Sequence, residues 1–453
     1  MASRTREAIG PAYLFLCLLA GGSAQGVWAN MVLQLLGLVL IAWAAAANRS
    51  AVPLPARQLF LVILAGLAWV ALQLVPLPPS VWAHLGGREP VAAGYRVLGL
   101  AAPSLPLSLS PYDRLRTLLA LTPALSILSA MIGLKAYRPS WLAAAMIAAT
   151  FCGILLGAMQ VASTSPDASP FYLFPESSFG LATGFFANAN HMATLLVVSL
   201  PFLAALLASA RRLSPQRYSA LAAILAGAGL VVIVGIALNG SLAGYLLALP
   251  VIAASLLIVI PPRSTFRRWA AAIAALCLVV ALGALEASSI RPAGFGAEAS
   301  TSVNSRQEIL ETTTAAASDF MPFGSGVGTF RQVYRMYEDP AHVTATYVIH
   351  AHNDYAELAL EAGIPGILLL LLFLAWWAAA VRRVWSSAEA GPYARAGSIA
   401  SAAILAHSLV DFPLRTAAIS VIFASCLALL ADRRPTPPAV KSDLRPTRHV
   451  VLR

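Results

Sequence analysis

Charged residues are scarce in this chain. Only 11% of its 453 residues are Asp, Glu, Lys or Arg, whereas 59% are hydrophobic and the mean hydropathy is +0.77. Soluble domains contain about 25% charged residues, so this composition excludes an ordinary water-soluble fold. Apolar runs fill most of the sequence instead. Runs of about 20 residues are long enough to cross a hydrocarbon core of about 30 Å.

Clustered cysteines and strand-like alternation are also missing. The four cysteines stand singly within apolar runs, which gives neither a CxxC metal pattern nor a disulfide framework. Inside a bilayer every backbone N–H and C=O group needs an internal partner, so apolar runs without alternation predict helices rather than a barrel. We therefore expect an all-α polytopic membrane protein of about 12 transmembrane helices. The expected spans are 8–24, 28–48, 57–76, 114–134, 141–160, 187–209, 217–238, 241–260, 268–286, 363–381, 394–411 and 416–432.

The net charge of +11 follows membrane topology and does not indicate nucleic-acid binding. With the N-terminus in the cytoplasm, 21 of the 30 basic residues fall in the cytoplasmic pieces, but only four of the 19 acidic ones do. That bias is the positive-inside rule, and it also puts the C-terminus in the cytoplasm. Arg4 and Arg6, followed by an apolar stretch and Gly22-Ser23-Ala24, also fit a cleavable signal peptide. Cleavage would leave the sidedness of every later loop unchanged.

The expected spans, with alternate loops on opposite sides of the membrane, divide the chain into four regions. Residues 1–286 hold spans one to nine with outer loops near 77–113 and 161–186, and residues 287–362 form one large loop on the non-cytoplasmic face. Residues 363–432 hold the last three spans, and 433–453 form a basic cytoplasmic tail that suits anionic headgroups. The large loop is too long for a passive connector. Within it, the turn Gly324-Ser325-Gly326-Val327-Gly328 leads into a helical pattern from Phe330 to Tyr337 whose aromatic stripe could lie on the bundle or on headgroups.

Histidines gather at the outer face, as an active site at the water boundary would require. Six of the seven lie outside or in the outer half of a span, namely His84, His191, His342, His350, His352 and His407. The densest local pattern is His350-Ala351-His352-Asn353-Asp354-Tyr355, which precedes Gly363-Ile364-Pro365-Gly366 at the head of an apolar helix. His350 and His352 with Asp354 and Glu357 also suit a metal ion. Both a transferase site and a metal site therefore stay open from the pattern alone.

His352-Asn353, a nine-residue gap and then Gly363-x-x-Gly366 resemble the signature of the bacterial O-antigen ligase and polymerase family. The likeness extends to Gly184–His191, to Ser305-Arg306 and to the turn from Gly324 to Gly328, and it covers about Leu181 to Leu430. One position departs from the family pattern, because Ser241-Leu242 stands where many relatives carry Ser-Arg. Another arginine must then hold the donor, or the activity differs from that of the best-known ligases.

The resemblance implies an inner-membrane glycosyltransferase with its active site facing the periplasm, which makes the large loop periplasmic. Its donor would be a glycan on a polyprenyl diphosphate carrier, and its acceptor a hydroxyl of lipid A core for a ligase or of a carrier-linked glycan for a polymerase. It also implies transfer without a metal or another cofactor. A transporter or flippase is the rival class, but this chain shows few midplane charges and no internal repeat.

The residue types suit such a transfer independently of the family. A sugar diphosphate is already activated, so the enzyme needs a base for the acceptor hydroxyl and cations for the departing diphosphate. An imidazole with an ordinary pKa near 6.5 is partly neutral at physiological pH, and we predict that His352 is the base, with Asn353 beside it. Arginine grips phosphate oxygens bidentately. The candidates for the diphosphate clamp are Arg306, ranked first, and Arg331, Arg335 and Arg415.

Four further residues are predicted to support the site. Asn188, Asn190 and His191 lie where an outer loop enters the membrane and could bind sugar or phosphate, although helix capping explains them equally well. Asp411 lies near the outer end of a span, where an ionisable group needs a partner. We expect an Asp411–Arg415 pair, with a place in the wall of the site as the alternative.

Overall fold

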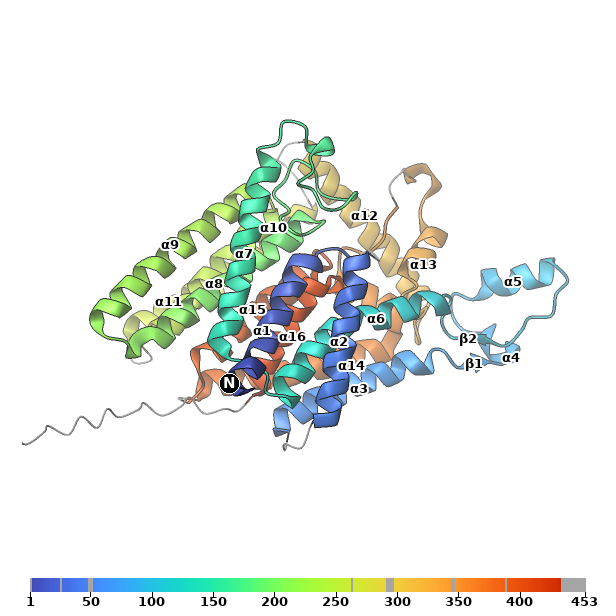
Figure 1. Ribbon diagram of the computed structural model, residues 1–453. Helices are drawn as coiled ribbons and strands as arrows, with labels where there is room; N and C mark the ends of the chain where they lie inside the picture. Colours follow the sequence, from blue (N-terminus) through green and yellow to red (C-terminus); the bar gives the residue numbers. More distant parts are fainter. Residues whose placement is uncertain are drawn as a thin grey trace, which may run out of the picture.

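The computed structural model describes residues 2–24, 27–47, 52–261, 264–290, 297–343, 347–387 and 389–432. The predicted basic tail, 433–453, lies outside these residues. The described chain is almost entirely helical, which confirms the expected all-α class (Figure 1). The helices are α1 (Ala2–Ala20), α2 (Trp28–Ala47), α3 (Leu54–Leu72), α4 (Pro79–Trp82), α5 (Glu89–Val97), α6 (Pro111–Leu128), α7 (Pro139–Val161), α8 (Ala189–Ser209), α9 (Pro215–Asn239), α10 (Leu242–Val259), α11 (Thr265–Ile290), α12 (Ala297–Asp319), α13 (Phe330–Tyr337), α14 (Asp354–Ser386), α15 (Pro392–His407) and α16 (Ala417–Ala431).

Each of the expected apolar segments overlaps one of these helices. Among the described residues, eight helices are long and apolar enough to cross a membrane, so the chain is a multi-pass membrane protein. They are α2, α3, α6 with its π-helical extension to Gly133, α7, α8, α9, α10 and α14. The expected crossings by α1, α11, α15 and α16 stay predictions.

The helices α8 and α16 form the centre of the bundle. Both are buried along most of their length and pack against α15 in one large apolar core. A helix that is apolar on all sides belongs in such a place. In Figure 1, α8, α15 and α16 lie in the middle, while α9 and α11 lie at the left. The centre therefore brings the start of α8 and the end of α15 together, although more than 200 residues separate them in the chain.

The large loop carries its own small apolar core. The predicted helix is confirmed as α13, and its aromatic stripe is buried, with the rings of Phe330 and Tyr334 stacked 5.5 Å apart. The stripe contacts α12 and the start of α14, so it lies on protein and not on headgroups. In Figure 1, α12, α13 and the 161–186 connection lie toward the end of the bundle opposite the start of α1.

The connection 77–113 holds short elements that the sequence did not predict. The strands β1 (Pro76–Leu77) and β2 (Leu105–Pro106) pair antiparallel and enclose α4 and α5, which project beside the bundle in Figure 1. Arg88, buried in this segment, donates hydrogen bonds to the carbonyl oxygens of Leu107 and Gly324. This side chain therefore ties the connection to the glycine-rich turn of the large loop.

A break divides α14 into two pieces. The helix begins at Asp354, nine residues before the expected span edge, but Gly363 interrupts it with φ 61° and ψ −155°. Only glycine adopts this region readily. A Cβ atom at Gly363 would meet the carbonyl oxygen of Pro322 at 2.3 Å. Close approach of the large loop therefore fixes the break, and the residues just before it form a separate short helix at the head of the apolar one.

Candidate functional site

His352 lies immediately before α14 in a strained backbone conformation. Its φ of 50° is uncommon for a residue with a Cβ atom, although histidine tolerates it better than most. Its Nδ1 atom lies 3.4 Å from Oδ1 of Asp411, and a quarter of its side chain is exposed. Nδ1 is therefore the ring nitrogen turned toward the buried carboxylate, and Nε2 lies on the far side of the ring.

Asn353 fixes the backbone beside His352. Its side-chain oxygen accepts hydrogen bonds from the N–H groups of Tyr355 and Ala356, which makes it the N-cap of α14. Its amide group donates to the carbonyl oxygen of Leu409. Asn353 thus joins the start of α14 to the segment after α15, and its contacts are those of a positioning residue.

Asp411 is the hub of the site, in the connection that follows α15. It is fully buried, accepts a hydrogen bond from Nδ2 of Asn190 and lies 4.0 Å from Nη2 of Arg306. The Nε2 atom of His191 lies 3.8 Å from it. Burial alone would raise the pKa of Asp411, but the contact with His352 and the charge of Arg306 hold that pKa well below its ordinary value. Asp411 is therefore a permanent negative charge at the centre of the cluster.

One aromatic ring separates three imidazoles. The Phe412 ring centroid lies 4.6 Å from that of His350, 4.9 Å from that of His352 and 5.2 Å from that of His191. His191 is buried, and within the described part of the chain neither of its ring nitrogens has a hydrogen-bond partner, although one faces Asp411. The Phe412 ring packs against all three imidazoles and so holds them in place around the Asp411 carboxylate.

The starts of α8 and α10 hold the other side of the hub. Asn190 accepts a 2.7 Å hydrogen bond from the Ser241 hydroxyl, and Ser241 in turn caps α10. Asn188 caps α8 by accepting from the N–H group of Asn190. Capping therefore accounts for Asn188, whereas Asn190 is a bridge between Asp411 and Ser241.

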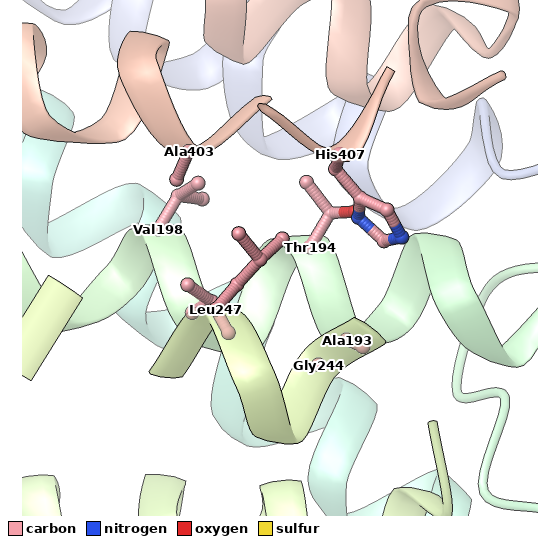
Figure 2. Close-up of a pocket in the computed structure, with 8 residues that line it drawn as sticks. Ala193, Thr194, Val198, Gly244, Leu247, Ala403 and His407 are labelled. Atoms are coloured by element: carbon pink, nitrogen blue, oxygen red, sulfur yellow. The ribbon is translucent and has the colours of Figure 1, made fainter. Parts of the chain in front are cut away.

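A buried hydrogen bond between α8 and α15 braces the base of the site. Figure 2 shows Thr194 and His407 meeting there, with Oγ1 of Thr194 2.7 Å from Nδ1 of His407. Gly244 of α10 lies beside them, and a Cβ atom there would meet the Cβ of Ala193 at 2.7 Å. Three helices consequently pack tightly just beneath the hub.

The expected Asp411–Arg415 pair is wrong. Arg415 instead contacts three carboxylates of the first turns of α14, at 3.4 Å for Asp354, 3.2 Å for Glu357 and 3.8 Å for Glu361. Burial would lower the pKa of Arg415, but these three groups raise it. The two residues diverge because 408–416 contains a turn and a short 3-10 segment (Pro413–Arg415) in place of an α-helix, so a four-residue spacing does not put them on one face.

The carboxylates around Arg415 connect the site to the large loop. Glu357 also contacts Nδ1 of His350 at 2.9 Å, so His350 is not a free surface neighbour of His352. Glu361 accepts hydrogen bonds from the N–H groups of Gly328 and Phe330, which anchors the glycine-rich turn and the start of α13. Movement of the large loop would therefore disturb the helix that begins beside His352.

Among the described residues, Arg331 and Arg335 do not contact Asp411 or its partners. Their guanidinium groups contact the ring of Tyr347 at 5.8 Å and 4.4 Å, and among the described residues no carboxylate lies within ion-pair distance of either. Of the predicted residues, the structure thus assembles His352, Arg306, Asn190, His191 and Asp411. Asn188, Asn353 and Arg415 act on that group through neighbours.

Sequence reasoning overlooked Glu361 and Phe412. It considered Glu357 only as a metal ligand, and Ser241 only as part of a departure from the family pattern. A signal existed for the two glutamates, because Asp354, Glu357 and Glu361 follow at helical spacing on one face. No comparable signal marked Phe412, whose role depends on contacts distant in sequence.

The groups that suited a metal ion point to different partners. His350 pairs with Glu357, His352 with Asp411, and Asp354 with Arg415. Within the described ranges, no cluster of three His, Cys, Asp or Glu residues has the geometry of a metal site. The four groups of the metal hypothesis therefore belong to three separate pairs in this structure.

Residues 227–371 match a family model described as O-antigen ligase. The matched stretch includes Ser241, Arg306 and His352, while the hub residue Asp411 lies outside it. No curated protein matches the chain at a significant level.

Proposed function

We propose that this chain, whose family match supports its assignment to the O-antigen ligase and polymerase family, transfers a glycan from a polyprenyl diphosphate carrier to an acceptor hydroxyl. We further propose that it does so at the periplasmic face of the bacterial inner membrane. The acceptor is lipid A core if the chain acts as a ligase. A polymerase, which would use a carrier-linked glycan as acceptor, is the alternative within the same family.

The pairing of His352 with the buried carboxylate of Asp411 is the observation that carries the proposal. A base held on one side by a carboxylate and open on the other is suited to take a proton from a hydroxyl group. The acceptor O–H donates to Nε2 of His352, and the imidazole takes that proton as the oxygen attacks the anomeric carbon of the donor. Asp411 stabilises the imidazolium that forms.

Arg306 completes the reaction on the leaving side. As the new C–O bond forms, the bond from the anomeric carbon to the carrier diphosphate breaks, and the diphosphate oxygen keeps the electron pair. An arginine at that oxygen stabilises the added charge. Arg306 suits this role because it belongs to the hub and is a third exposed. Arg415 is less suitable because three carboxylates already surround it.

The central test is His352→Ala, assayed with carrier-linked donor and acceptor in detergent. Loss of a general base should lower the turnover by about 10²-fold or more. His84→Ala is the matched control, since that imidazole is exposed and contacts only the nearby Ser80 carbonyl oxygen among the described residues. Near-normal turnover of His352→Ala, on protein matched for amount and monodispersity, would refute the assignment.

The proposed transfer needs no metal ion. The histidines and carboxylates of the motif are committed to ion pairs with one another and with arginine. Turnover should therefore survive treatment with a strong chelator. Loss of turnover that one specific divalent ion restores would replace this mechanism with a metal-dependent one.

Glycan analysis of a deletion strain separates the two family activities. A missing ligase should leave polymer accumulating on the carrier while long chains disappear from the lipid anchor. A missing polymerase should leave single repeats on the anchor. Unchanged surface glycans in the deletion strain would contradict both.

A further inference from the structure

We propose that Arg331, Arg335 and Tyr347 form a binding platform for an anionic sugar of the acceptor glycan. The platform rests on the proposed function, because it concerns the second substrate of that reaction. It gives the two arginines a role other than holding the diphosphate of the donor.

The three side chains gather on the outer face of the large loop. Phe330, Val333 and Tyr334 bury the inner face of α13, so Arg331 and Arg335 occupy its exposed face. Tyr347 remains 63% exposed although both guanidinium groups lie beside its ring. The cluster is therefore not needed to fill the core, and its surfaces are open to a ligand.

The charges of the cluster call for an anion. Two arginines four residues apart on one helix face repel each other, and such like-charged pairs destabilise a helix. Among the described residues neither guanidinium forms a salt bridge, and the Tyr347 ring is the neighbour that both of them face. A phosphate or carboxylate group between them would remove the repulsion and could accept bidentate hydrogen bonds from both forks.

The exposed ring of Tyr347 indicates a ligand that is itself ring-shaped. A flat aromatic face beside two guanidinium groups suits a ring-shaped molecule that has an apolar face and a charged substituent. A sugar that carries a phosphate or a carboxylate has both properties. A lipid headgroup offers the phosphate without the sugar ring, which makes it the second possible source of the anion.

The position of the platform favours the acceptor over the donor. Tyr347 precedes His352 by five residues, and a fully extended chain of that length spans at most about 18 Å. A glycan lying on the platform is thus within reach of the base that deprotonates the acceptor. The donor diphosphate is assigned to Arg306, on a different helix.

The test uses the double variant Arg331→Gln/Arg335→Gln and lipid A core acceptor in its phosphorylated form and after phosphatase treatment. The KM for phosphorylated acceptor should rise about tenfold, while kcat and the KM for donor stay within about twofold of the wild type. With dephosphorylated acceptor, the double variant and the wild type should have the same KM. Tyr347→Leu should raise the KM for both acceptor forms. Arg96→Gln is the control and should change none of these values, because this exposed side chain pairs with Glu89 within α5.

Other outcomes would overturn the platform in distinguishable ways. An unchanged acceptor KM in an enzyme that still transfers glycan would reject the platform and leave the proposed function intact. A raised donor KM would assign the platform to the donor glycan. If the wild type transfers glycan to no acceptor, the proposed function fails, and the platform is then tested by binding alone. That experiment measures how labelled phosphorylated acceptor binds to His352→Ala. If that binding follows the anionic lipid content of nanodiscs and ignores acceptor phosphate, the arginines contact headgroups and the platform is rejected.

Discussion

At the scale of single residues, the site depends on one carboxylate that serves several partners. Asp411 contacts His352, Arg306, Asn190 and His191 from four separate segments of the chain. A buried negative charge with this many partners is costly to neutralise and costly to leave unpaired. Its replacement should therefore affect the chemistry of His352 as well as its position.

Asp411→Asn should lower turnover. The pKa of Asp411 lies well below its ordinary value, so the wild-type carboxylate is charged and can stabilise the imidazolium that the proposed transfer forms. The asparagine amide keeps the shape of the side chain but loses that charge. Turnover of both proteins, measured on protein matched for amount and monodispersity, provides the test. Equal turnover of Asp411→Asn and the wild type would contradict the functional pairing of His352 with Asp411.

At the scale of elements, the break in α14 is the most sensitive point. Gly363→Ala introduces a Cβ atom against the backbone of Pro322 and forces a conformation that costs about 1–3 kcal/mol. We expect a lower thermal midpoint together with reduced transfer, because the large loop and the start of α14 lose their contact. Gly227→Ala is the control, since a Cβ atom there meets nothing within 4 Å. Equal midpoints for the two variants would show that the break is unnecessary.

The helices could be predicted because a bilayer imposes a simple rule on sequence. About 20 apolar residues are needed for each crossing, so composition alone located the segments that overlap the observed helices. The helix from Phe330 to Tyr337 followed from periodicity in the same way. Side-chain contacts between different helices and loops could not be predicted from the sequence in this way. The predicted Asp411–Arg415 pair assumed α-helical spacing in a segment that turns, and the hub contact of Asn190 joins residues 221 positions apart.

At the scale of the whole molecule, the predicted sidedness still requires a direct test. The basic residues assign alternate loops to the cytoplasm, so both termini should lie inside and 287–362 outside. A periplasm-active reporter fused after Tyr337 should be active, and the same reporter fused after Arg212 should be silent. A silent reporter after Tyr337 together with an active one after Arg212 would show that the topology is reversed. The proposed site would then lie on the cytoplasmic side, away from its proposed donor.

On the proposed topology, the break at Gly363 also sets the depth of the proposed chemistry. From Ile364 to Ser386 the helix extends about 34 Å at 1.5 Å per residue, which by itself matches the hydrocarbon thickness of a bilayer. We expect the turns that hold Asp354, Glu357 and Glu361 to stand just above the acyl chains, level with the phosphates of the proposed carrier, whose prenyl tail stays in the lipid. A site at this depth would contact the diphosphate of its carrier and not the prenyl chain. Carriers with shorter or longer prenyl chains should therefore serve it about equally well.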